Sequence, residues 1–206
     1  MSDADRPQIY LVTPPAIDLE TFPDRLARVL DAVEIACIRL ALWERDEFAL
    51  GRAADALRTV AHERDVALVI QNHLLLVERH GLDGLHLSDG ARSLRDARKA
   101  LGADAIVGAF CGASRHEGIS AGESGADYVA FGPIGPSALG KGEVAAHDLF
   151  AWWSEMIEVP VVAEGALTED LVRQFAPVTD FFGIGDEIWG AEDPALALRA
   201  LVAAMA

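Results

Sequence analysis

Two charged side chains stand inside stretches of sequence that are otherwise typical of buried strands. Arg39 lies within the apolar run 37–42, and Glu164 closes the apolar run 161–163. A charge at such a place must be paired or must face a wet cavity, because an isolated buried ion loses its hydration. The economical hypothesis is an ion pair between Arg39 and Glu164. The alternative is two independent, partly solvated side chains at strand ends.

Two histidines could transfer protons, since imidazole titrates close to neutral pH. His73 follows Gln71 and Asn72 where an apolar strand ends, so it could reach an open site. His86 lies in the short segment 84–87, where a lone histidine is more often a hydrogen-bonded core group than a catalyst. Both are candidate general bases, with a core role as the alternative for His86.

A glycine- and proline-rich loop spans residues 131–142. Its glycines expose backbone N–H groups, and Ser137 and Lys141 add a hydroxyl and a cation. These are the components of an anion-binding cradle. Most loops of this composition are simply turns, so a solvated Lys141 on an ordinary turn is the alternative.

Strand-length apolar runs alternate with helix-length amphipathic segments along the whole chain, which predicts parallel βαβ units. The expected strands are 9–13, 35–42, 67–70, 84–87, 105–110, 128–131, 159–163 and 181–184. The expected helices are 21–33, 50–63, 74–79, 93–101, 114–124, 147–157, 168–175 and 193–205. Ser93 and Thr168 are the expected N-caps of two of these helices.

Eight such units in one chain predict a single-domain (β/α)8 TIM barrel over residues 1–206. A doubly wound open sheet is the alternative, but it favours a glycine-rich loop after the first strand, where this chain has Thr13-Pro14-Pro15. The active site of a barrel lies at the C-terminal ends of its strands. That rule selects the loop 132–141, which holds Ser137 and Lys141, and the strand-end residues Arg39, Trp43, Gln71, Asn72, His73, His86, Asp89, Phe110, Cys111, Glu164, Gly165, Gly185, Asp186 and Glu187.

The formal net charge of −16 argues against nucleic acid and anionic membranes as partners. No apolar run reaches the ~18 residues of a membrane span, and residues 1–7 lack the features of a secretory signal. We therefore expect a cytoplasmic protein. Cys37 and Cys111 form no disulfide framework, and we expect both to be buried free thiols. The oligomeric state, including a homo-oligomer, stays open.

Four segments resemble the thiamine phosphate synthase/thiazole tautomerase family, namely 8–13, 84–87, 125–133 and 161–165. The likeness runs from about residue 8 to 200, and 125–133 is its most specific part. The resemblance implies a (β/α)8 barrel, in agreement with the strand and helix pattern. It also implies a reaction that joins an aminopyrimidine diphosphate to a thiazole phosphate and releases pyrophosphate. The resemblance implies Mg2+ as the cofactor of this reaction. The expected partner is thus a small phosphorylated metabolite or a related heterocycle.

This chain departs from the family pattern where the diphosphate would bind. The Gln, Arg and Lys of the family's Gln-x-Arg-x-Lys motif align with Arg39, Ala41 and Trp43. The two cations of the motif are therefore lost, and a cation stands instead at the position of the glutamine. The family's Asn-Asp pair falls on Gln71-Asn72, which replaces a magnesium carboxylate with an amide. The resemblance leaves Asp89 as the nearest acid for the metal. Phe110 stands where the family has a serine at the end of the fifth strand.

The thiazole phosphate end departs as well. The family binds this phosphate through backbone donors after strands seven and eight. A Gly-Gly pair there becomes Gly165-Ala166, and a small polar residue becomes Asp186, followed by Glu187. Two like charges 4 Å apart repel by about 4 kcal/mol at an effective dielectric constant of ~20. The resemblance implies substrate contacts from Arg39, Gln71, Asn72, Ser137, Lys141, Glu164, Gly165, Gly185 and Asp186.

Three functions remain open at this point. The first is a thiamine phosphate synthase with an altered site. The second is a tautomerase or isomerase that uses His73 or His86 as general base and needs no grip on pyrophosphate. The third is a non-catalytic ligand-binding or partner protein on the same fold.

Overall fold

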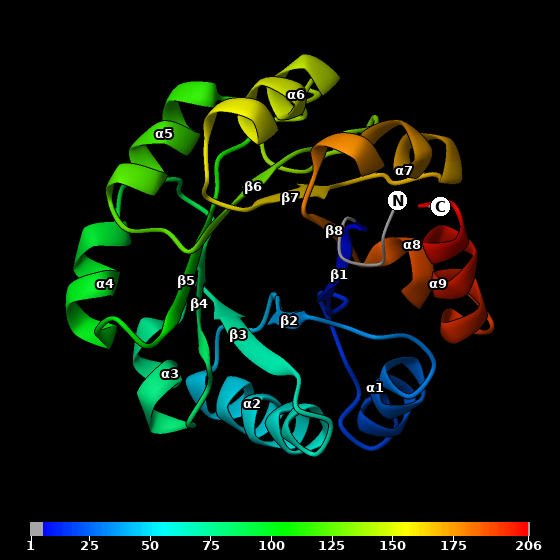
Figure 1. Ribbon diagram of the computed structural model, residues 1–206. Helices are drawn as coiled ribbons and strands as arrows, with labels where there is room; N and C mark the ends of the chain where they lie inside the picture. The colour runs from blue at the N-terminus through cyan, green and yellow to red at the C-terminus, as the bar shows by residue number, and fades with distance from the viewer. Residues whose placement is uncertain (1–5, 206) are drawn as a thin grey trace.

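The eight strands close into a parallel barrel (Figure 1). The computed structural model describes residues 6–205. Each strand pairs in parallel with the next, and β8 pairs with β1, so the sheet has no free edge. The predicted (β/α)8 barrel is confirmed, and the open doubly wound sheet is wrong. The strands are β1 (Gln8–Val12), β2 (Cys37–Leu40), β3 (Ala67–Gln71), β4 (Gly84–Leu87), β5 (Ile106–Phe110), β6 (Tyr128–Phe131), β7 (Val161–Glu164) and β8 (Phe181–Ile184).

The helices form a ring outside the barrel (Figure 1). They are α1 (Phe22–Leu30), α2 (Glu47–His62), α3 (Leu74–Arg79), α4 (Leu94–Leu101), α5 (Arg115–Glu123), α6 (His147–Met156), α7 (Glu169–Phe175), the 3-10 turn η2 (Ala176–Val178), α8 (Asp186–Trp189) and α9 (Pro194–Ala203). The helices expected from amphipathic spacing are present, with ends shifted by a few residues. Neither η2 nor α8 was predicted, because segments of three or four residues show no helical period.

One of the two predicted caps is confirmed. The Thr168 hydroxyl accepts a hydrogen bond from the backbone N–H of Leu171 at 3.2 Å, at the start of α7. Ser93 makes no such bond at the start of α4, so its predicted capping role is wrong. Its hydroxyl instead donates to the Asp89 carboxylate at 2.8 Å.

Alternate residues of each strand face the barrel interior, as the two-residue period of a strand requires. Tyr10, Val69 and Tyr128 belong to the interior cluster, whereas Leu11, next to Tyr10, packs against the helices. Gly108 on β5 makes room for Tyr128, because a Cβ atom there would lie 2.0 Å from the tyrosine ring. The interior therefore holds large polar side chains among its apolar ones.

Three aspartates fasten the N-terminal ends of the strands. Each stands just before an even-numbered strand, and its carboxylate accepts the backbone N–H of a residue at or near the start of the preceding strand. The bonds join Asp83 to Leu68 (2.7 Å), Asp127 to Val107 (2.7 Å) and Asp180 to Val161 (2.8 Å). This repeated contact belongs to the end of the barrel where stability, not catalysis, is usually encoded.

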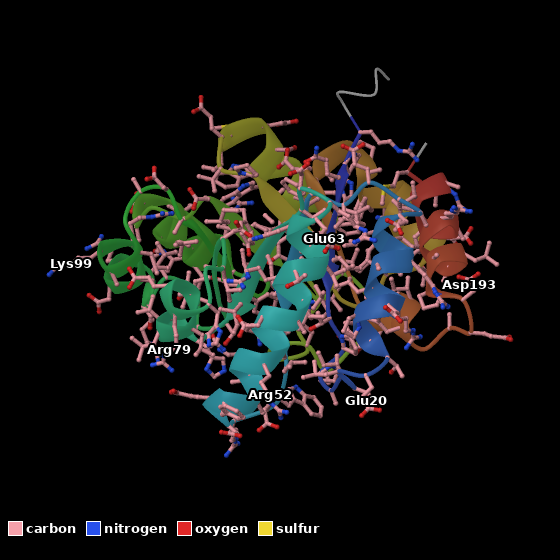
Figure 2. All side chains as sticks on the ribbon, turned by 90° about the horizontal axis from the view of Figure 1, so that it is seen from below. Glu20, Arg52, Glu63, Arg79, Lys99 and Asp193 are labelled. Atoms are coloured by element: carbon pink, nitrogen blue, oxygen red, sulfur yellow. The ribbon has the colours of Figure 1, made fainter. Side chains whose placement is uncertain are left out.

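Charged side chains such as Arg52, Arg79 and Lys99 project outward from the helices (Figure 2). Within residues 6–205, no helix is long and apolar enough to cross a membrane. Cys37 and Cys111 are buried free thiols, as predicted, and burial raises the pKa of each to about 12.

Candidate active site

The predicted ion pair between Arg39 and Glu164 is confirmed. Arg39 Nη2 lies 2.5 Å from Glu164 Oε2, and the two side chains are only 6% and 3% exposed. β2 and β7 lie on different sides of the barrel, so the pair spans its interior. Each charge compensates the other, which is the condition for burying either one.

The pair continues into a chain of buried polar groups. Arg39 Nη1 lies 2.8 Å from His86 Nε2, and His86 Nδ1 lies 2.9 Å from the Tyr128 hydroxyl. The Tyr128 hydroxyl lies 2.5 Å from that of Tyr10. The chain therefore runs from Glu164 through Arg39, His86 and Tyr128 to Tyr10, with members from β7, β2, β4, β6 and β1. We call these five residues the interior network.

The chemistry of arginine fixes the proton on His86. A guanidinium donates hydrogen bonds and accepts none, so Nε2 of His86 must be the unprotonated acceptor. Nδ1 then carries the proton and donates it to the Tyr128 oxygen. Burial, and next the Arg39 charge, hold the pKa of His86 well below its ordinary value. His86 is thus a neutral imidazole whose basic lone pair faces Arg39.

Burial also governs the other members of the interior network. Burial alone would lower the pKa of Arg39, but the Glu164 charge and the tyrosines raise it above the ordinary value, so the guanidinium stays charged. Burial is the largest cause that raises the pKa values of Tyr10 and Tyr128, so both hydroxyls stay neutral. The Arg39 Nε atom is buried and has no hydrogen-bond partner among residues 6–205.

The other predicted polar residues of β3 lie at the C-terminal mouth of the barrel. Gln71 is partly buried at the end of β3, and His73 is partly buried just before α3. Asn72 adopts a left-handed backbone conformation with φ of 64°. Its side-chain amide accepts from the Ser88 N–H at 2.9 Å and donates to the Ser88 hydroxyl at 2.8 Å. This contact ties the ends of β3 and β4 together.

The loop 132–142 is folded onto the mouth, but its donors are already in use. The Ile134 and Gly135 N–H groups donate to backbone carbonyls after β7, and the Leu139 N–H donates to the Ser137 hydroxyl. Lys141 is exposed. The predicted anion cradle in this loop therefore lacks free N–H groups at these three places.

A carboxylate links the ends of β7 and β8. Glu187 Oε1 accepts from the Leu167 N–H at 3.0 Å, and Glu187 Oε2 accepts from the Gly185 N–H at 2.8 Å. Gly165 adopts φ of 90°, so the chain can turn sharply after β7. Asp186 is exposed beside this link.

Comparison with known proteins assigns the chain to a family. The sequence model described as thiamine monophosphate synthase matches residues 9–179. The chain is 40% identical to "Thiamine-phosphate synthase" of Rhodospirillum centenum over 184 residues, which cover 88% of this chain and 89% of that protein. It is 35% identical to the protein of the same name from Erythrobacter litoralis, over 95% of this chain and 94% of that one.

The chain belongs to the thiamine monophosphate synthase family.

A solved structure has the same fold. "Thiamine phosphate pyrophosphorylase from Pyrococcus furiosus" superimposes with a TM-score of 0.84 over 96% of this chain and 95% of that chain, at 20% identity. The resemblance noted in the sequence is therefore confirmed, together with the assignments to thiamine biosynthesis and to the transferases. The family binds phosphorylated heterocycles.

Members of the thiamine monophosphate synthase family generally use Mg2+. Residues 6–205 contain no group of three or more His, Cys, Asp or Glu side chains that could hold a metal ion by themselves. Asp89 is an exposed carboxylate directly after β4, and Asn72 offers an amide oxygen at the neighbouring strand end. These are oxygen donors of the kind that bind magnesium together with substrate phosphates.

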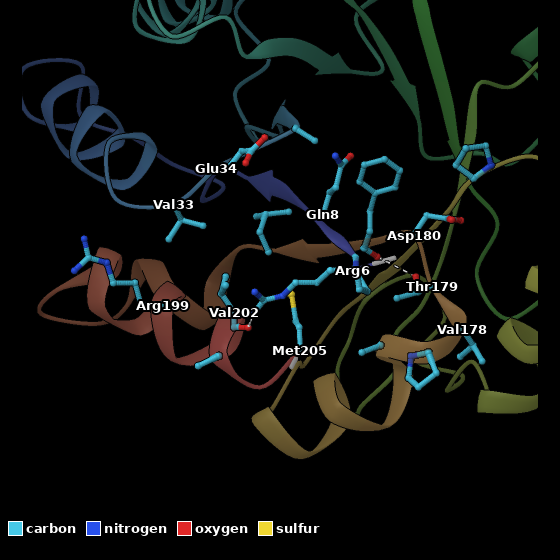
Figure 3. A pocket seen from close by; sticks show the side chains of 18 of the residues that line it. Arg6, Gln8, Val33, Glu34, Val178, Thr179, Asp180, Arg199, Val202 and Met205 are labelled. Atoms are coloured by element: carbon cyan, nitrogen blue, oxygen red, sulfur yellow. Dashed lines mark hydrogen bonds between the residues drawn. The ribbon is translucent and has the colours of Figure 1, made fainter. Parts of the chain in front are cut away.

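A large cavity lies at the opposite, N-terminal end of the barrel (Figure 3). It has a volume of about 1180 Å3 and is lined by residues such as Gln8, Glu34 and Asp180, which precede or begin strands. Arg6 also lines it and donates to the Val202 carbonyl. Barrel chemistry takes place at the other end of the strands, so we do not assign the active site to this cavity.

Sequence reasoning missed two residues of the interior network. Tyr10 and Tyr128 extend that network, and their interior strand positions were the available signal. Glu187 was selected at the mouth as a repulsive charge, whereas its carboxylate links two loops. No sequence pattern shows which backbone N–H groups a carboxylate will meet.

Proposed function

We propose that this chain catalyses the coupling reaction of its family at the C-terminal mouth of the barrel. In this reaction the carbon–oxygen bond of an aminopyrimidine diphosphate breaks first, and its electron pair leaves with pyrophosphate. The thiazole nitrogen then forms a bond to the methylene carbon. The observation that carries the proposal is the 40% identity to a thiamine-phosphate synthase over 88% of the chain.

Neutral groups at the mouth suit a neutral aminopyrimidine. Gln71 and Asn72 end β3 with side-chain amides, which can both donate to and accept from ring nitrogens and an amino group. Phe110 is partly buried at the end of β5 and offers an aromatic face for a flat heterocycle. We assign these three side chains to holding and orienting the pyrimidine.

The positive charge that stabilises the leaving diphosphate must come from groups outside the interior network. Arg39 is neutralised by Glu164, so this pair adds no net charge beneath the mouth. We assign Asp89 as the protein carboxylate that would hold magnesium together with diphosphate oxygens. When bound, the ion neutralises the charge that develops on the leaving group. Lys141 is the nearby loop cation that the sequence offers for the same purpose.

The interior network lies buried below the C-terminal mouth, and its hydrogen bonds fix the positions of its side chains. Arg39, His86 and Glu164 are all at most 5% exposed, so water does not reach them freely. A general-base role for His86 has no support in this geometry, because its lone pair accepts from Arg39. The tautomerase alternative is therefore not favoured for this residue, and His73 stays a candidate without an assigned proton. The cytoplasmic location stays a prediction.

The test is a coupling assay with aminopyrimidine diphosphate, a thiazole partner and MgCl2, followed by chromatography of the products. Both the thiazole phosphate and the thiazole alcohol are supplied in separate reactions. We expect enzyme-dependent formation of a thiazolium product and of pyrophosphate. Absence of any product above the enzyme-free background, at high enzyme and with both thiazoles, would overturn the proposal. A Gln71→Ala variant should raise KM for the pyrimidine and leave the fold intact.

A further inference from the structure

The Glu187 carboxylate engages two backbone donors, one after β7 and one after β8. It accepts from the Leu167 N–H after β7 at 3.0 Å and from the Gly185 N–H after β8 at 2.8 Å. Glu187 itself is partly buried, and Leu167 and Gly185 are buried. Each carboxylate oxygen therefore takes one N–H group from a different loop.

These loops are where (β/α)8 barrels frequently bind a phosphate group. A phosphate dianion and a carboxylate need the same N–H donors, and two anions in contact repel each other. The Glu187 side chain thus competes with a phosphate group for these two donors. A phosphate that used the Leu167 and Gly185 N–H groups would have to displace both hydrogen bonds of Glu187.

The charges around Glu187 do not favour such an exchange. Asp186 is an exposed carboxylate next to it in sequence. Glu164 lies against β8, since a Cβ atom on Gly183 would be 2.7 Å from its Cβ, but its charge is already used by Arg39. Among residues 6–205, no arginine, lysine or histidine lies within 4.0 Å of the Glu187 or Asp186 carboxylates.

We propose that Glu187 determines specificity by excluding the phosphate ester, so that this chain couples a thiazole alcohol in preference to thiazole phosphate. The inference rests on the proposed coupling function. Each carboxylate oxygen has a lone pair beyond the one used by its N–H donor, so Glu187 can accept a hydrogen bond from the hydroxyl of the alcohol. The bond changes at the thiazole nitrogen and the pyrimidine methylene are those given above, and the hydroxyl keeps its proton. The product is then thiamine itself.

The first experiment measures kcat/KM for both thiazoles at saturating aminopyrimidine diphosphate and MgCl2. We expect the wild-type chain to favour the alcohol at least 100-fold. Glu187→Ala removes the carboxylate and frees both N–H groups, so the preference should reverse. Glu187→Gln keeps the size and removes the charge, and should narrow the preference without a full reversal. Asp180→Ala is the matched control, because its carboxylate also accepts a backbone N–H but lies at the N-terminal end of the barrel, and it should leave the ratio within about threefold.

A second experiment measures binding of thiazole phosphate by calorimetry, so that the inference is tested even without turnover. We expect saturable binding to Glu187→Ala and at least 100-fold weaker binding to the wild-type chain. Circular dichroism confirms that each variant is folded.

The outcomes separate the two proposals. Coupling that favours thiazole phosphate in the wild-type chain would overturn the role of Glu187 and leave the coupling function standing. No product with either thiazole would overturn the coupling function, and the binding experiment alone would then decide the role of Glu187. If Glu187→Ala melts at a lower temperature but shows unchanged ratios and unchanged binding, Glu187 is only a structural link between the loops.

Discussion

The two ends of this barrel use the same interaction in different places. At the N-terminal end, Asp83, Asp127 and Asp180 each accept a backbone N–H at 2.7–2.8 Å from the start of a neighbouring strand. At the C-terminal end, Glu187 accepts two backbone N–H groups at 2.8 and 3.0 Å. The first three bonds fasten strands, while the last pair closes loops that barrels use for ligands.

The comparison shows that a hydrogen bond does not reveal its role by its geometry alone. A carboxylate on a strand-start N–H replaces a missing ladder partner and contributes to stability. A carboxylate bonded to the loop N–H groups after β7 and β8 also determines whether a ligand can accept hydrogen bonds from those groups. Variants at the two ends should therefore separate stability from specificity.

The largest effect is expected in the interior network, which lies between the two ends. Glu164→Leu leaves the Arg39 guanidinium buried without a counter-charge and should lower the free energy of unfolding by about 3–5 kcal/mol. Urea unfolding measures this loss. The double variant Arg39→Met/Glu164→Leu removes both charges and should recover most of it. A single variant as stable as the wild-type chain would show that the ion pair is not buried as described.

The N-terminal end should show a smaller effect on stability and none on chemistry. Asp180→Ala removes the acceptor of the Val161 N–H and should cost about 1–3 kcal/mol of unfolding free energy. The coupling rate of the folded variant, assayed well below its melting temperature, should match the wild-type rate. A change in the ratio of rates for the two thiazoles would contradict the division between the ends.

The smallest effect concerns pH. Because burial and Arg39 hold the pKa of His86 below its ordinary value, the unfolded chain binds a proton at His86 that the folded chain does not. The free energy of unfolding should keep its full value above about pH 6.5, the pKa of a histidine in the unfolded chain. It should fall by up to about 1.4 kcal/mol for each pH unit below that value. Urea unfolding at pH 7.0, 6.0 and 5.5 measures this slope. His86→Gln should flatten it, and an equal slope in the variant would assign the effect to other groups.

The sequence predicted the parts that depend on local pattern. Apolar runs of strand length between amphipathic segments predicted all eight strands, and a charge within two such runs predicted the meeting of Arg39 and Glu164. Both inferences rest on periodicity and on the cost of burying a charge, which are properties of the chain itself.

The remaining contacts depend on strand register and loop shape, which cannot be predicted from the pattern of a single sequence. Tyr10 and Tyr128 meet because β1 and β6 face each other across a barrel whose register aligns them. The sequence predicted Ser93 as an N-cap, but its hydroxyl donates a hydrogen bond to the Asp89 carboxylate instead. Glu187 bonds to Leu167, 20 residues earlier in the chain, only because two loops converge.

Exclusion of the phosphate ester depends most on the hydrogen bonds of Glu187 to the Leu167 and Gly185 N–H groups. The most direct test is the melting temperature of three matched proteins with and without thiazole phosphate, namely the wild-type chain, Glu187→Ala and Asp180→Ala. At 100 times the dissociation constant, a ligand adds about 2.7 kcal/mol of stability, or about 5–10 °C for a chain of this size. We predict that rise for Glu187→Ala alone, whereas an equal rise in all three proteins would contradict the account.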